Sequence, residues 1–117
     1  MSRMLVIEKS PVVATDIVET VCGAFPQLDA VAVMSIEDAE AALSDSSQIN
    51  LCIVSGSTTH DRLTRLAALL GDRRVRTVVM TDDTDKSDLF GSGTIHLSQP
   101  FTSEMLLDAV RRLSHDA

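Results

Sequence analysis

Polar side chains follow several short apolar runs of this sequence. Glu8 and Lys9 come directly after the first run, and Ser55 follows the third, LCIV. Two later runs are followed by Thr81 and by the pair Gln99 and Pro100. If the runs are parallel strands, their carboxyl ends meet at one edge of a sheet, where such folds usually place a working site. A carboxylate, an ammonium group and hydroxyl groups gathered there could bind a cation, take up a phosphoryl group or supply a nucleophile.

The elements that must position these groups alternate between short apolar runs and helical patterns. The predicted strands are Met4–Ile7, Asp29–Met34, Ile49–Val54, Val75–Met80 and Thr94–Leu97. A helix-type pattern follows each of the first three strands and the fifth. With right-handed crossovers this alternation predicts an α/β fold, in which helices cover both faces of a parallel sheet.

Helix boundaries are signalled by capping residues. Ser10 with Pro11 should begin the first helix, and Ser35 with Asp38 the second. Gly71 should end the third helix, and Thr102 or Ser103 should begin the last. The predicted inward faces are Val13, Ile17 and Val21 in the first helix, with Ala14, Val18 and Phe25 beside them, then Ala39, Ala42 and Leu43 in the second, Leu63, Leu66, Ala67 and Leu70 in the third, and Leu106, Ala109, Val110 and Leu113 in the last.

The segment between the fourth and fifth strands is the weak place in the pattern. Residues Asp82–Phe90 contain four Asp and one Lys and have little apolar periodicity. A fourth helix there should be short, frayed or absent.

Composition bounds the possible functions. The 117 residues are enough for one domain, residues 1–117, and 44% of them are hydrophobic. A net charge of -7 and the absence of Trp and Tyr argue against nucleic-acid binding. No apolar run is long enough to cross a membrane or to act as a signal peptide, which places the chain in the cytoplasm. Cys22 and Cys52 lack metal or disulfide spacing and are expected to be buried thiols.

The order and spacing of three motifs, MLVIEKS, VVMT and LSQPF, make the chain resemble a response-regulator receiver domain of two-component signalling. The resemblance covers nearly the whole chain. It implies a flavodoxin-like (βα)5 doubly wound sandwich, with a five-stranded parallel sheet in the order 2-1-3-4-5. A receiver of this kind has acidic residues after strand one that hold magnesium, and an aspartate after strand three that accepts the phosphoryl group. It also has a Ser or Thr after strand four and a lysine before the proline after strand five.

Three central positions depart from that pattern. Glu8 keeps the first acidic position, but Lys9 stands where a second acid is expected. Ser55 stands at the phospho-acceptor position, and a hydroxyl there cannot form an acyl phosphate. Gln99 replaces the lysine and brings no positive charge to balance a phosphate. The sequence therefore predicts neither a metal site nor a catalytic residue nor a cofactor.

Two other positions match the family more closely. Thr81 and Pro100 agree with its pattern, and His96 occupies the place of a switch residue that is usually aromatic. For Lys9, two interpretations stay open. Its ammonium group either pairs with Glu8 or Ser55 near the ion position, or points into solvent. Ser55 has a purely structural alternative as well, as a cap for the loop that follows it.

The resemblance implies a degenerate, or pseudo-, receiver that signals through protein contacts without its own aspartyl phosphorylation. Its partners would be a histidine kinase, an output domain or another regulator, and the face Asp82–Arg112 could form a homodimer. The chain would not be an enzyme and would bind neither nucleic acid nor membrane.

Three alternatives remain. The first is an ordinary phosphorelay receiver with a non-standard acceptor, for which Asp82 and Asp83 are candidates. The second is a small flavodoxin-like ligand- or nucleotide-binding domain using the loop Ser55–His60, SGSTTH. The third and weakest is a hydrolase in which His60 or His96 acts as a base for Ser55, without a nucleophile-elbow pattern. His115 completes the three histidines, and no pair of them has metal-ligand spacing.

Overall fold

Five parallel strands form a single sheet in the order β2-β1-β3-β4-β5, which confirms the predicted fold class. The computed structural model describes residues 3–45, 49–55, 60–72, 75–80, 94–97 and 102–115. The strands are β1 (Arg3–Ile7), β2 (Asp29–Val33), β3 (Ile49–Ser55), β4 (Arg76–Met80) and β5 (Thr94–Leu97). The helices are α1 (Pro11–Ala24), α2 (Ile36–Asp45), α3 (His60–Asp72) and α5 (Ser103–His115).

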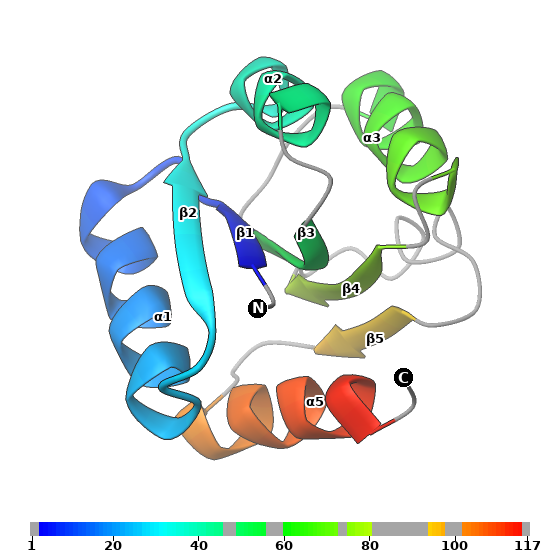
Figure 1. Cartoon of the computed structure of the whole chain (residues 1–117). Coiled ribbons are helices and arrows are strands. Elements are labelled where there is room, and N and C mark those ends of the chain that lie inside the picture. The colour runs from blue at the N-terminus through cyan, green and yellow to red at the C-terminus, as the bar shows by residue number, and fades with distance from the viewer. Residues whose placement is uncertain are drawn as a thin grey trace.

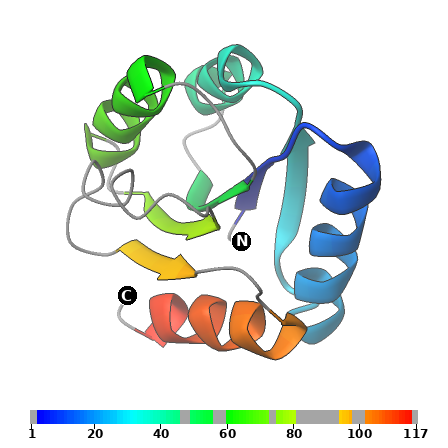
Figure 2. The ribbon, with the colours of Figure 1, turned by 180° about the vertical axis from the view of Figure 1, so that it is seen from behind.

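The helices form two layers, one on each face of the sheet. Helices α2 and α3 lie together on one face, while α1 and α5 cover the other (Figure 1). The view from behind shows the same arrangement, with the sheet between the layers (Figure 2). Each layer closes its own hydrophobic cluster against the sheet. This is the doubly wound arrangement that right-handed crossovers produce.

The central strand β3 explains the uninterrupted apolar run LCIV. Cys52 and Val54 belong to the cluster under α2 and α3. Leu51 and Ile53 belong to the cluster under α1 and α5. Successive side chains of a strand point to opposite faces, so a strand covered on both sides needs an apolar residue at every position.

The predicted capping residues begin three helices. The Ser35 hydroxyl accepts a hydrogen bond from the Asp38 N–H at 3.1 Å, and the Thr102 hydroxyl accepts one from the Met105 N–H at 3.2 Å. At α1, the Ser10 side chain accepts from the Val13 N–H at 3.5 Å, and the Ser10 carbonyl accepts from Ala14. These bonds satisfy N–H groups that the first turn of a helix leaves without partners.

Some boundaries and faces differ from the prediction. The inward face of α1 is Ala14, Ile17 and Val21, and Val13 is 39% exposed at its rim. Val13 is one residue before Ala14, and one residue turns the helix by about 100°, which moves its side chain off the core. Helix α3 continues through Gly71 to Asp72. It closes where the Val75 N–H donates to the Leu70 carbonyl.

The two thiols are buried to different degrees. Cys52 is fully buried in β3, whereas Cys22 is only partly buried in α1, so the prediction of a buried thiol is wrong for Cys22.

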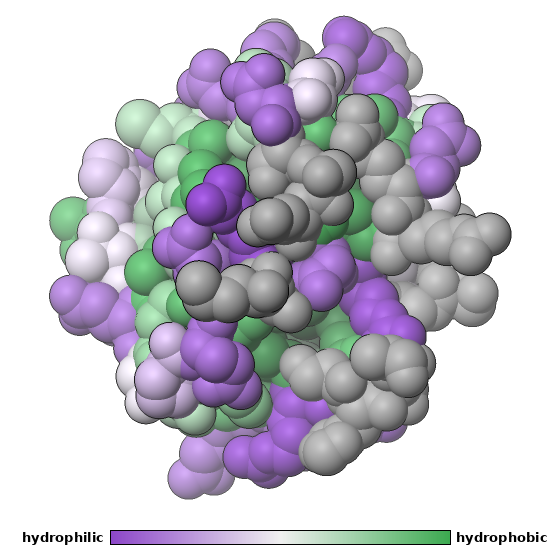
Figure 3. Space-filling model, in the orientation of Figure 1, coloured by the Kyte–Doolittle hydropathy of each residue, from purple (hydrophilic) through white to green (hydrophobic). Residues whose placement is uncertain are grey.

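The predicted weak fourth helix, Asp82–Phe90, lies outside the described residues. Among the helices that are described, none is long and apolar enough to span a bilayer. On the face seen in Figure 3, hydrophilic and hydrophobic residues are mixed along the left flank, where Figure 1 places α1.

Candidate functional site

Strand register brings Glu8 and Ser55 together at the carboxyl edge of the sheet. Strand β1 pairs with β3 so that Ile7 lies opposite Val54. Glu8 directly follows Ile7 and Ser55 directly follows Val54, so the two residues lie side by side at the carboxyl ends of β1 and β3. On its other side, the Glu8 N–H donates to the Val33 carbonyl of β2 at 3.0 Å. Two residues that are 47 positions apart in the sequence are thus in direct contact at the strand ends.

The Glu8 carboxylate is buried, and both of its oxygens accept hydrogen bonds. Glu8 as a whole residue is only 7% exposed. Oε2 accepts from the Ser55 hydroxyl at 2.5 Å, and Oε1 accepts from the Ser10 N–H at 3.0 Å. A buried charge without such donors would cost free energy. The two donors therefore stabilise the buried Glu8 carboxylate.

Lys9 does not take part in this arrangement. Its side chain is exposed, and it makes no hydrogen bond or ion pair within the described part of the chain. The predicted contact of its ammonium group with Glu8 or Ser55 is therefore wrong, and the alternative that Lys9 points into solvent agrees with the structure. The hydrogen bonds that Glu8 accepts come from Ser55 and Ser10 instead.

The sequence did not identify the Ser10 N–H as a partner of Glu8. The sequence pattern indicates Ser10 only as the residue that caps α1. A carboxylate just ahead of a helix lies close to the positive end of the helix dipole and to free N–H groups. An acidic residue two positions before a capping serine is the signal that could have found this contact.

Other predicted site residues are only partly placed. His96 lies in β5, opposite Val79 of β4, but its side chain is not described. His60 begins α3, and its side chain is likewise not described. Thr81, Asp82, Asp83, Gln99 and Pro100, with most of the Ser55–His60 loop, lie outside the described residues. Within the described part, no three His, Cys, Asp or Glu side chains gather into a metal-binding group.

Neither thiol is activated. Burial raises the pKa of Cys52 far above its ordinary value. Partial burial, and to a lesser degree the charge of Asp29, also raise the pKa of Cys22, whose thiol donates to the Leu28 carbonyl at 3.7 Å. A raised pKa keeps a thiol protonated, whereas a nucleophilic cysteine needs the thiolate. The hydroxyl–carboxylate pair is thus the chemically distinctive feature of the described carboxyl edge.

Comparison with known proteins gives a structural answer only. No family model matches the sequence, and no curated protein matches it either. Among solved structures, a response regulator receiver protein from Sinorhizobium medicae WSM419 superposes with a TM-score of 0.80 at 18% identity, covering 97% of this chain and 94% of that chain. The chemotaxis protein CheY4 of Vibrio cholerae gives 0.76 at 14% identity, covering 97% of this chain and 98% of that chain.

A putative pilus assembly-related protein from Burkholderia pseudomallei K96243 also has a similar structure. Its TM-score is 0.76 at 14% identity, and the match covers 100% of this chain and 92% of that chain. The chain therefore has the fold of response regulator receiver domains over nearly its whole length.

Proposed function

We propose that residues 1–117 form one receiver-like domain of a two-component response regulator that signals through protein contacts and carries no aspartyl phosphate of its own. The observation that supports this most directly is the 2.5 Å hydrogen bond from the Ser55 hydroxyl to the Glu8 carboxylate. In a receiver the position of Ser55 holds the acceptor aspartate, and Glu8 helps to hold magnesium. Here the Ser55 hydroxyl donates its hydrogen bond to the Glu8 carboxylate.

The chemistry of phosphoryl transfer needs groups that this pocket lacks. An acyl phosphate requires a carboxylate at the acceptor position, and Ser55 has only a hydroxyl. Magnesium prefers carboxylate oxygens, and Lys9 and Ser55 bring none to the positions where a receiver has acidic residues. Lys9 adds a positive charge next to Glu8 in the chain, and Gln99 supplies none where a receiver has its lysine. The transferred phosphate would therefore find neither acceptor nor charge compensation.

The role that follows is that of a protein-contact module. Its partners are a histidine kinase, an output domain or another regulator, in the cytoplasm, and it catalyses no reaction. The net charge of -7 favours protein partners over nucleic acid. A homodimer through the face Asp82–Arg112 stays a proposal, because much of that face lies outside the described residues.

The test is incubation with acetyl phosphate and magnesium, followed by intact-protein mass spectrometry. We expect no mass gain for the wild-type chain. The matched positive control is the variant Lys9→Asp, Ser55→Asp, Gln99→Lys, which rebuilds the receiver set and should gain one phosphoryl group. A stoichiometric phosphoryl gain in the wild-type chain would show that another residue, for which Asp82 and Asp83 are candidates, has become the acceptor.

A further inference from the structure

Strand β2 lies at one edge of the sheet, and part of its main chain faces away from β1. The Val33 carbonyl accepts a hydrogen bond from the Glu8 N–H, so the main-chain groups of Val33 point towards β1. These directions alternate along a strand, and the N–H and carbonyl groups of Ala30 and Ala32 therefore point outwards. Within the described chain, no strand pairs with β2 on that outer side. Main-chain groups at such an edge can bind a further strand.

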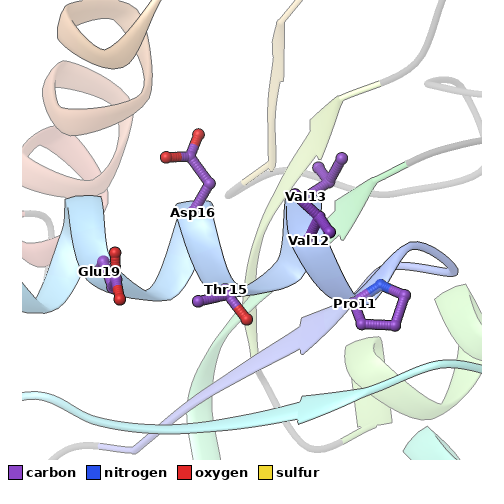
Figure 4. Close-up of a pocket in the computed structure, with 6 residues that line it drawn as sticks. All are labelled: Pro11, Val12, Val13, Thr15, Asp16 and Glu19. Carbon is purple, nitrogen blue, oxygen red and sulfur yellow. The ribbon is translucent and has the colours of Figure 1, made fainter.

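The described helices leave this edge open. Figure 1 shows β2 at the front of the molecule, beside α1 and below α2, with no helix in front of it. Ala32 is exposed, and so is Met34, just beyond the end of the strand, at 56%. Figure 4 shows Pro11 and Thr15 on the side of α1 nearer to β2, whereas Asp16 points to the opposite side. At these two positions α1 therefore presents uncharged side chains towards the edge.

The devices that usually protect an edge strand are missing from β2. Natural edge strands are often interrupted by Lys, Pro or a bulge. Residues 29–34, DAVAVM, contain neither Lys nor Pro, and β2 pairs with β1 in an unbroken register. The charge of Asp29 is paired with Arg3 of β1 at 3.0 Å. Nothing in the sequence of β2 therefore opposes pairing with a further strand.

We propose that β2 pairs in antiparallel direction with β2 of a second copy of this chain, about a two-fold axis at Val31. In this register Ala30 lies opposite Ala32 of the second copy, and Ala32 lies opposite Ala30 of that copy. Both residues have outward main-chain groups, so each opposed pair can exchange both of its N–H···O bonds. Met34 comes opposite Leu28 of the second copy, which gives an exposed apolar side chain an apolar neighbour.

The edge suits a second copy because the register is self-complementary and sets no like charges opposite one another. Asp29 lies opposite Val33 of the second copy, and its carboxylate already contacts Arg3. Each copy carries a net charge of -7, which opposes association, so salt should strengthen the dimer. This inference uses the fold alone. It goes beyond the proposed function and does not depend on it.

Sedimentation equilibrium of the wild-type chain tests the pairing, in about 0.5 M salt and from about 10 μM to 1 mM protein. We expect a monomer–dimer equilibrium. Ala32→Pro removes an N–H that the dimer uses twice, and an edge strand tolerates Pro where its N–H faces solvent, so the dimer should weaken about tenfold. Ala32→Lys places a charge at the edge and should also weaken the dimer. The matched control Val12→Lys adds the same charge at a residue of α1 that is 79% exposed, and it should change the Kd by less than about twofold.

A cysteine at position 31 tests the register. On the two-fold axis the Cα atoms of the two Val31 residues would lie about 4.5 Å apart, within reach of a disulfide bond. With oxidised glutathione as the oxidant, Val31→Cys should therefore form a covalent dimer. Ala32→Cys should not, because the two copies of that residue lie about 8 Å apart in this register. The wild-type chain, which contains Cys22 and Cys52, gives the background of cross-linking.

Three results would overturn this inference. The first is a wild-type chain that stays monomeric over the whole concentration range. The second is a dimer that Ala32→Pro and Ala32→Lys leave intact, which would belong to another face such as Asp82–Arg112. The third is equal cross-linking of the variants at positions 31 and 32. No arm contains magnesium or a phosphoryl donor, so a monomer here leaves the proposed function in place, and a phosphoryl gain in the earlier test leaves the dimer result readable.

Discussion

At the scale of single residues, the Glu8 carboxylate decides the character of the pocket. It is buried, and its charge is stabilised by one side-chain donor, Ser55, and one backbone donor at Ser10. A cation could supply the same stabilisation from outside, but the protein supplies it from its own chain. Ser55 therefore has a structural role at the strand end, because its hydroxyl donates to the buried acid.

The substitution Ser55→Ala tests this role. It removes the donor to Glu8 Oε2 and leaves a buried carboxylate oxygen without that partner. We expect the free energy of unfolding to fall by about 1–3 kcal/mol, measured by urea denaturation. Ser44→Ala is the matched control, because its hydroxyl donates to the Glu40 carbonyl on an exposed helix surface. That control should change stability by less than about 0.5 kcal/mol, and equal effects of the two variants would contradict the argument.

The buried thiol of Cys52 makes the free energy of unfolding depend on pH in the alkaline range. Burial raises the pKa of Cys52, whereas a thiol in the unfolded chain titrates near pH 8.5. Above that pH the unfolded chain loses a proton that the folded chain keeps, so the unfolded state becomes favoured. The contribution of Cys52 to stability is therefore complete below about pH 8.5 and decreases as the pH rises towards the folded pKa.

Cys52→Ala should remove this contribution. Between about pH 8.5 and 10, the wild-type chain should lose stability more steeply than the variant, by a difference that approaches about 1.4 kcal/mol per pH unit. Urea denaturation at a series of pH values measures both slopes, and the subtraction removes the titration of lysines common to both chains. Parallel curves would show that the Cys52 thiol titrates alike in both states.

At the scale of elements, the sequence predicted most of the fold because its strongest signals are local. Alternating apolar runs and helical patterns identified the strands, and Ser10, Ser35 and Thr102 identified three helix starts. The prediction placed Val13 on the buried face of α1 and ended α3 at Gly71. The packing of each helix against the sheet decides which side chains are buried and where the helix ends, and the linear pattern does not contain that information.

The site was less predictable, because its contacts join distant residues. Their meeting at the strand ends was expected from the topology, but the choice of partner was not. Glu8 could have paired with Lys9 beside it, with Ser55 across the sheet or with a backbone N–H. The register of β1 against β3 and the start of α1 decide among these, and neither can be read from residue types alone.

The capping bond of α5 gives a prediction at this scale. Thr102→Ala removes the side-chain acceptor of the Met105 N–H and should lower the free energy of unfolding by about 0.5–2 kcal/mol. Thr102→Ser keeps the hydroxyl and should retain most of that stability. Thermal or urea denaturation of both variants provides the comparison. If serine and alanine are equally destabilising, the cap contributes less than the lost methyl group.

At the scale of the whole molecule, the proposed loss of phosphorylation chemistry predicts a protein whose stability does not depend on magnesium. The charge that a receiver balances with a cation is here balanced by hydrogen bonds inside one chain. A ligand stabilises a fold only if it binds the folded state, so melting temperature reports directly on whether a cation site exists. The wild-type chain should melt at the same temperature with and without magnesium.

Ser55→Asp should create the dependence that the wild-type chain lacks. It places a second carboxylate against Glu8, whose oxygen now lies 2.5 Å from the Ser55 hydroxyl. Two carboxylates about 4 Å apart repel by up to about 4 kcal/mol at an effective dielectric constant near 20, so the variant should melt well below the wild-type chain without a cation. Magnesium prefers carboxylate oxygens and should recover about 2.7 kcal/mol at a hundredfold excess over its Kd. Ser55→Asn has nearly the same shape without the charge, and its melting temperature should not respond to magnesium. If Ser55→Asp and Ser55→Asn melt alike under both conditions, the side chain at position 55 does not face Glu8 in solution, and the hydrogen bond at the centre of the proposal is absent.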